Sequence, residues 1–177
     1  ALAATPLFHQ SGSRDTVLIE RPAAILATVG DLPAPTTPNG TPPLTVVDVA
    51  WELGPVLAAP SWVADLLRHS PSVVVTATAT IPGLRRLEAA LAMLAHTRSV
   101  AAVLGPRRRK WPRAVALSAG PLSAALISGG RLVEVPTDAR LAARGLDSEA
   151  LPTSLLHAAT DLLHLTHDVP DRKEPLT

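Results

Sequence analysis

The 177-residue chain contains no cysteine and no tyrosine, and it has only one phenylalanine, one methionine and three tryptophans. The absence of cysteine excludes disulfide bonds and thiolate chemistry. It also fits a reducing compartment, so we expect a cytoplasmic location. No apolar run reaches the roughly 18 residues that a membrane-spanning helix needs, because Arg, His, Asp or Pro interrupts every candidate. The sequence therefore predicts a soluble protein without a membrane span.

The composition is that of a folded protein. With 47% hydrophobic and 18% charged residues and a mean hydropathy of +0.26, the chain is too apolar for a disordered or coiled-coil protein. Its length suits one domain with its own core, which we expect over residues 1–166, followed by a flexible tail at 167–177. Ala, Val and Leu supply most of the apolar mass, and Arg outnumbers Lys by fourteen to two, a bias that indicates a high-GC bacterial genome.

Short β-branched runs alternate with longer segments of helical period along the chain. The runs that predict strands are 16–20, 44–50, 72–78, 100–104 and 131–135. The segments that predict helices are 61–69, 80–94, 121–128 and 153–165, and residues 1–8 resemble the end of another helix. This alternation predicts an α/β fold, a three-layer, doubly wound and mostly parallel sheet with helices on both faces.

The predicted helix over 80–94 has the clearest pattern. Its leucines recur at spacings of three and four, which places them on one buried face, while its charged residues face water. We expect Thr80 to cap this helix, Ser61 to cap the helix of 61–69, and one residue of Gly129-Gly130 to adopt a positive φ after residue 128. The leucines are Leu84, Leu87, Leu91 and Leu94, and the charged residues are Arg85, Arg86 and Glu88.

Polar residues at the carboxyl ends of the predicted strands are candidates for a site, because open α/β sheets bind ligands beyond those ends. Asp48 lies near the end of a strongly apolar run, where an unpaired carboxylate is costly. It is either linked to a metal or a structural cap. Glu20, Thr76 and Thr78 end other predicted strands, and Pro136-Thr137-Asp138 follows the last one.

Five pieces of sequence follow one another along the chain: Val-Leu-Ile-Glu to residue 20, Val-Val-Asp-Val around Asp48, Val-Val-Val-Thr-Ala-Thr to residue 78, Gly83-Leu84-Arg85-Arg86-Leu87, and Val135-Pro136-Thr137-Asp138 with Leu141 and Gly145 after it. Their order resembles that of the ParA/MinD-like P-loop ATPases. Each piece alone has little specificity, and the resemblance lies in their order over residues 1–165. It implies that Asp48 helps to hold a magnesium water and that Pro136 and Asp138 line the adenine pocket. It also implies ATP and magnesium as ligands, ATP-dependent homodimers, and a role in positioning, partition or assembly regulation on DNA or a membrane.

The chain departs from that family in its phosphate-binding loop. No Gly-rich stretch followed by Lys-Ser or Lys-Thr occurs in it, Glu20 stands where the family commonly has Asp, and Val49-Ala50-Trp51 follows Asp48 in place of a Pro-rich segment. We favour a chain that begins downstream of the phosphate loop and its central strand. The alternative is a pseudo-ATPase that kept the fold and lost hydrolysis. The sequence predicts an ATPase only if that loop stands upstream of Ala1.

The charge of the chain is concentrated at one place. The net charge is only +1, with an isoelectric point near 8.7, so the chain as a whole does not indicate a nucleic-acid partner. The exception is Arg107-Arg108-Arg109-Lys110, with Trp111 and Arg113 after it. Clustered cations beside an aromatic ring suit DNA phosphates and base stacking, while a solvated loop is the plainer interpretation. A non-catalytic module that binds DNA or a protein partner through residues 107–113 is therefore the second hypothesis.

Other chemistry has little support. His157 and His164 are seven residues apart on one predicted helical face, and His167 follows, but no acidic partner pattern accompanies them. Thr160 and Asp161 fit an ordinary helix surface. No Gly-x-Ser-x-Gly elbow occurs, so hydrolase chemistry with a serine nucleophile is not indicated.

Overall fold

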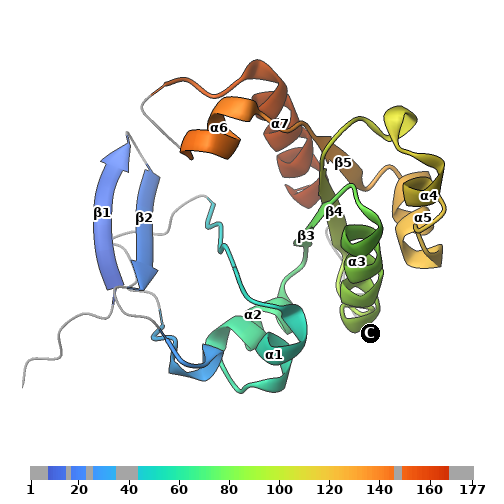
Figure 1. Ribbon diagram of the computed structural model, residues 1–177. Helices are drawn as coiled ribbons and strands as arrows, with labels where there is room; N and C mark the ends of the chain where they lie inside the picture. Colours follow the sequence, from blue (N-terminus) through green and yellow to red (C-terminus); the bar gives the residue numbers. More distant parts are fainter. Residues whose placement is uncertain (1–7, 15–16, 23–25, 35–43, 146–148, 168–177) are drawn as a thin grey trace, which may run out of the picture. The chain divides into compact units, whose positions relative to one another are not determined.

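The structure, a computed structural model, describes residues 8–14, 17–22, 26–34, 44–145 and 149–167 (Figure 1). It divides into two compact units, Ala1–Leu67 and Arg68–Thr177, where the sequence predicts one domain. Each unit is described by itself below. Of the predicted helix end at 1–8, only Phe8 is described, and it begins a strand instead of ending a helix. Of the predicted tail at 167–177, only His167 is described, and it ends a helix.

The first unit begins with a two-stranded antiparallel hairpin. Strand β1 (Phe8–Arg14) pairs with β2 (Val17–Pro22), with Arg14 opposite Val17 and Phe8 opposite Pro22. The sequence predicts a strand at 16–20, and β2 confirms it, but the predicted place in a parallel sheet with its end at Glu20 is wrong. Only two residues separate the strands, and such a short connection joins antiparallel neighbours, whereas parallel strands need a crossover of about a dozen residues. Glu20 therefore does not lie at the carboxyl edge of a parallel sheet.

Short helices and a small core complete the first unit. The elements are η1 (Val29–Asp31), α1 (Leu53–Ala58) and α2 (Trp62–His69), of which the last two residues belong to the second unit. Val29, Val56 and Val63 are buried together. The Trp62 ring packs against this core, and its Nε1 donates to the carbonyl oxygens of Leu32 and Pro33. The Ser61 hydroxyl accepts from the N–H of Ala64 at 3.2 Å, so the predicted cap is confirmed.

Residues 44–50 form no strand, which corrects the sequence prediction. The segment carries no strand assignment, all but one of its residues are exposed, and Val46 is 78% exposed. A β-branched run becomes a strand only when a neighbouring strand satisfies its backbone groups and covers one face. Among the described residues, none pairs with this segment. Asp48 consequently lies in an exposed segment without regular structure and does not end a buried strand.

The second unit contains a three-stranded, all-parallel sheet. Its strands β3 (Val73–Thr78), β4 (Ser99–Leu104) and β5 (Leu132–Val135) lie in the order β3-β4-β5, with Val73 opposite Ser99 and Ala101 opposite Leu132. The three β-branched runs thus become neighbouring strands, as expected. The connections and the end of the unit hold α3 (Ile81–Met93), η2 (Arg108–Lys110), α4 (Arg113–Ala116), α5 (Pro121–Ser128), α6 (Ala139–Arg144) and α7 (Thr153–His167).

Helices cover both faces of this sheet, so the α/β fold class is confirmed. Alternate strand residues Val75, Ala101 and Val103 join the core formed with α3 and α5. Helix α7 packs against all three strands, and Figure 1 shows it on the side opposite α3. The described strands follow one another in sequence order, so a reversal of strand order, where doubly wound sheets bind ligands, does not occur among them.

Helix α3 agrees with its sequence pattern at every predicted position but one. Its leucine face is buried, with Leu84 fully covered. After α5, Gly130 has a φ of +65°, the positive φ expected there. The Thr80 hydroxyl accepts from the N–H of Gly83 at 3.1 Å, as predicted. The exception is Glu88, expected in water: it is half-buried, and its carboxylate binds the first turn of α5. The sequence period of α3 alone does not reveal that another helix, α5, packs against its polar side.

Candidate functional site

The loops after β4 and β5 meet at one edge of the sheet because all three strands are parallel. Gly105, which begins the loop after β4, donates its N–H to the carbonyl of Val135 at the end of β5, at 3.0 Å. Gly105 has a φ of +144°, a conformation that L side chains rarely adopt. The loop that carries the basic run therefore starts beside the loop that carries Pro136.

The backbone of the basic loop, defined as residues 105–111, is held at several points. Trp111 is 9% exposed in the core, and its Nε1 donates to the carbonyl of Pro106 at 2.8 Å. The N–H of Arg108 donates to the carboxylate of Glu134, on β5, at 3.0 Å. Within η2, the N–H of Lys110 donates to the carbonyl of Arg107 at 2.7 Å. The loop is thus anchored to the core and to β5.

The predicted use of Trp111 as a base-stacking platform is wrong, since its ring is buried and its only donor is engaged by Pro106. The prediction rested on the position of Trp111 directly after the cations in the sequence. The deciding factor is the large apolar area of an indole ring, which favours the core.

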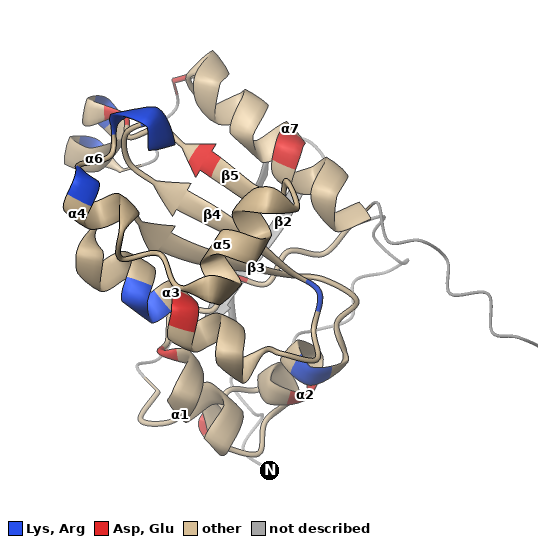
Figure 2. Cartoon of the chain, turned by 90° about the vertical axis from the view of Figure 1, so that its right-hand side faces the viewer, with Lys and Arg blue, Asp and Glu red and all other residues tan. Residues whose placement is uncertain are grey.

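The cations of the basic loop, and Arg113 after it, are accessible to solvent. The side chains of Arg107, Arg108, Arg109, Lys110 and Arg113 are exposed, and Figure 2 shows the blue ribbon of η2 near the end of β5. Within the part of the chain that the structure describes, none of the five forms an ion pair. Five cations so close together in the sequence create a local positive potential in a nearly neutral chain.

An open groove lies along β5 and α7, with a volume of about 920 Å³. One set of lining residues comes from the basic loop: Arg107, Arg109 and Lys110. The loop after β5 contributes Pro136 and Thr137, and β5 itself contributes Glu134. The groove therefore joins the two loops that follow β4 and β5, which are about 30 residues apart in the sequence.

Helix α7 supplies the other wall of the groove. Its lining polar residues are Ser154, His157, Asp161 and His164. Their spacings of three, four and three place them on one helical face, and this polar stripe was the sequence signal that identifies the wall. From the sequence alone, Asp161 fits an ordinary helix surface and the two histidines suggest only metal ligation. In the described residues, no group of three or more acidic or histidine side chains is placed to hold a metal ion.

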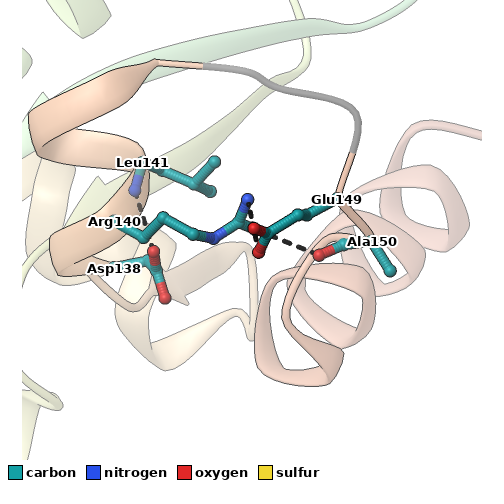
Figure 3. Close-up of polar contacts among 5 residues, drawn as sticks. All are labelled: Asp138, Arg140, Leu141, Glu149 and Ala150. Carbon is teal, nitrogen blue, oxygen red and sulfur yellow. Dashed lines mark hydrogen bonds and ion pairs between the residues drawn. The ribbon is translucent and has the colours of Figure 1, made fainter.

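The two residues predicted for the adenine pocket have different surroundings. Pro136 lines the groove, whereas Asp138 does not. Asp138 caps α6, because its Oδ1 accepts from the N–H of Leu141 at 2.9 Å (Figure 3). Two residues along, Arg140 donates to the carbonyl of Ala150 at 3.0 Å and pairs with Glu149 at 3.4 Å, and so ties α6 to the chain before α7. The structure thus assigns Asp138 a structural role.

The residues present suit one of the two predicted ligands, ATP and magnesium, better than the other. The cationic end of the groove fits the phosphates of a nucleotide, because Arg and Lys side chains bind phosphate oxygens through charge-assisted hydrogen bonds. Asp48 is exposed, lies in the first unit, and among the described residues belongs to no metal-binding group. Its surroundings do not fit a magnesium site, since Mg²⁺ in proteins is held by carboxylates arranged together with phosphates.

The described helices include none long and apolar enough to cross a membrane. Comparisons of the chain with family models, curated proteins and solved structures found no match.

Proposed function

We propose that this chain is a nucleotide-binding protein with a ParA/MinD-like fold that acts in positioning, partition or assembly regulation. One observation supports this most: the loops after two neighbouring parallel strands line one groove, with Pro136 and Thr137 on one side and the cations of the basic loop on another. Ligand sites beyond the carboxyl ends of parallel strands are the rule in α/β sheets. Of the segments on which the resemblance rests, those around 72–78 and 131–135 form strands of this parallel sheet, whereas 16–20 pairs antiparallel and 44–50 forms no strand.

In this proposal the base of ATP lies against Pro136 and Thr137. Both residues line the groove, and the half-buried Pro136 offers an apolar surface to an adenine ring. Asp138 contributes by holding the loop, through its bond to Leu141. We propose binding, and not hydrolysis, because no Gly-rich loop with Lys-Ser or Lys-Thr occurs in the 177 residues.

Calorimetric titration of the purified chain with adenosine and with ATP tests the proposal. Thr137→Trp places a large ring in the groove and is expected to weaken adenosine binding by at least about tenfold, or 1.4 kcal/mol. Leu117→Trp is the matched control, because Leu117 is 74% exposed and does not line the groove. Absence of binding by the unmodified chain, or an equal loss in both variants, would contradict the proposal.

Oligomerisation is a separate readout of the same function. Nucleotide-dependent proteins of this class associate when their ligand is bound, so we expect a larger homodimer fraction with ATP than without it. Sedimentation velocity at several protein concentrations measures this directly, and a mass unaffected by ATP would remove dimerisation from the proposal.

A second function is supported by the five exposed cations without ion pairs in the described chain. It is a non-catalytic module that binds DNA, or an acidic protein partner, through Arg107, Arg108, Arg109, Lys110 and Arg113. Duplex DNA binding would weaken steeply with salt, with a log–log slope of about −4.5 if all five contact phosphates. Salt-sensitive DNA binding without any nucleotide binding would favour this function over the first.

A further inference from the structure

The cations of the basic run fall into two sets according to the groove. Arg107, Arg109 and Lys110 line it, whereas Arg108 and Arg113 do not. The 3-10 turn over 108–110 explains part of this division, because residues three apart in such a turn lie above one another. Arg107 and Lys110 have that spacing. A loop that served only as a solvated surface would have no reason to direct three of its cations into one groove.

These three cations stand on a backbone that is already fixed. The buried Trp111 donates a hydrogen bond to the carbonyl of Pro106, and the N–H of Gly105 donates to the carbonyl of Val135. The N–H of Arg108 donates to the carboxylate of Glu134. Little backbone entropy is therefore lost when a ligand binds, which favours affinity at a preorganised site.

The charge inside the groove is positive overall. Three cations face two carboxylates, those of Glu134 and Asp161, and Glu134 already accepts from the N–H of Arg108. His157 and His164, on the α7 wall, carry no negative charge in either protonation state. An anionic ligand is thus the chemistry that this groove suits.

The size of the groove narrows the class of anion. About 920 Å³ lies at the upper end of the range for small-molecule sites, roughly 300–1,000 Å³. A single inorganic phosphate would occupy a small part of it, while three cations suit several linked phosphates, each with oxygens that accept from Arg or Lys.

We propose that the groove of β5 and α7 binds a polyphosphate chain, with its phosphates against Arg107, Arg109 and Lys110. The chain belongs to a nucleoside triphosphate or is free triphosphate, and both share the same chemistry at these cations. The nucleotide case rests on the proposed function, and the free triphosphate case does not.

The experiment compares three probes in buffer of about 0.15 M ionic strength: inorganic triphosphate, ATP and adenosine. Removal of the three groove cations in Arg107→Ala/Arg109→Ala/Lys110→Ala is expected to weaken triphosphate and ATP binding by at least about tenfold. Adenosine binding should change less than twofold. The control Arg85→Ala/Arg86→Ala/Arg144→Ala removes the same charge outside the groove, and it should bind triphosphate as the unmodified chain does.

A charge-preserving variant guards against loss of folding. Arg107→Lys/Arg109→Lys keeps both charges on side chains that tolerate exposure, and it should retain most of the triphosphate affinity lost in the alanine variant. Equal losses in the two alanine triples, no triphosphate binding by the unmodified chain, or binding of duplex DNA without triphosphate would each overturn the proposal.

The outcomes also separate this proposal from the proposed function. Triphosphate binding without adenosine binding would leave the polyphosphate site standing and remove the nucleotide. Adenosine and ATP binding of equal strength, unchanged in the alanine triple, would retain the nucleotide and remove the phosphate site.

Discussion

The carboxylate of Glu88, on α3, accepts hydrogen bonds from both the backbone N–H and the hydroxyl of Ser123, in the first turn of α5, at 2.9 and 2.7 Å. Its other oxygen accepts from the N–H of Leu122 at 2.8 Å. The first N–H groups of a helix have no partner inside the helix, and here a neighbouring helix supplies one. A Cβ at Gly120, which precedes α5, would collide with the Glu88 side chain, so glycine leaves the carboxylate room.

Replacement of Glu88 by Gln is expected to lower the free energy of unfolding by about 1–2 kcal/mol. The amide keeps one acceptor oxygen but loses the charge and the second acceptor, and hydrogen bonds to charged groups contribute about 1.5–3 kcal/mol each at full burial. Partial exposure places the loss at the lower end. Urea unfolding at pH 7 measures the change. Asp161→Asn, at an exposed acidic residue of α7, is the control and should leave the stability within about 0.5 kcal/mol.

The same contact predicts how stability depends on pH. Partial burial alone would raise the pKa of Glu88, but the hydrogen bonds from Ser123 and Leu122 outweigh it and hold the pKa below the ordinary value of 4.5. The stabilisation is therefore fully present well above pH 4.5 and is lost as the pH falls through the lower pKa of the folded state. The stability difference between the unmodified chain and Glu88→Gln should shrink below pH 4.5. A difference that stays constant down to pH 3 would contradict the assignment.

Replacement of Gly83 by Ala should destabilise the second unit by about 1–3 kcal/mol. Gly83 lies in the first turn of α3, and a Cβ there would collide with the carbonyl oxygen and the hydroxyl of Thr78. The backbone of Thr78 lies on one side of Gly83, and the Thr80 hydroxyl holds its N–H on the other, so the start of α3 has little room to shift. Gly54→Ala is the contrasting variant, because a Cβ there meets nothing within 4 Å. Thermal unfolding of both variants tests whether the close approach is responsible.

Replacement of Trp111 by Phe should destabilise the second unit by about 1 kcal/mol, since the ring stays apolar but the bond from Nε1 to Pro106 is lost. Because that bond holds the start of the basic loop, triphosphate affinity should also fall, although no charge is removed. Leu117→Trp, at a position 74% exposed, checks that an aromatic change elsewhere has no such effect. Stability loss with full affinity would show that the anchor does not position the cations.

Replacement of Asp138 by Ala should cost about 1 kcal/mol through loss of the cap on Leu141, and Asp138→Asn should cost much less. Helix unfolding monitored by circular dichroism distinguishes the two variants. Because Asp138 does not line the groove, adenosine affinity should be equal in Asp138→Asn and the unmodified chain. A selective loss of adenosine binding in the asparagine variant would return Asp138 to the ligand site.

The sequence determined the parts of this protein whose signals are local. Three β-branched runs became β3, β4 and β5, and the spacing of Leu84, Leu87 and Leu91 fixed the buried face of α3. Thr80 and Ser61 were identifiable as caps because a cap depends on residues only three positions away. The short helices α1, α4 and α6 were missed, since four to six residues contain too little periodicity to detect.

Only the tertiary structure decided which elements found partners. Residues 44–50 have the composition of a strand, yet no described strand pairs with them, because pairing depends on a neighbour and not on propensity. Glu88 became a helix cap when α5 packed beside α3. Trp111 and the cations next to it in sequence were separated by burial, the ring in the core and the charges in a groove completed by α7. Local patterns specify elements, and the burial and charge that define a site arise when distant elements meet.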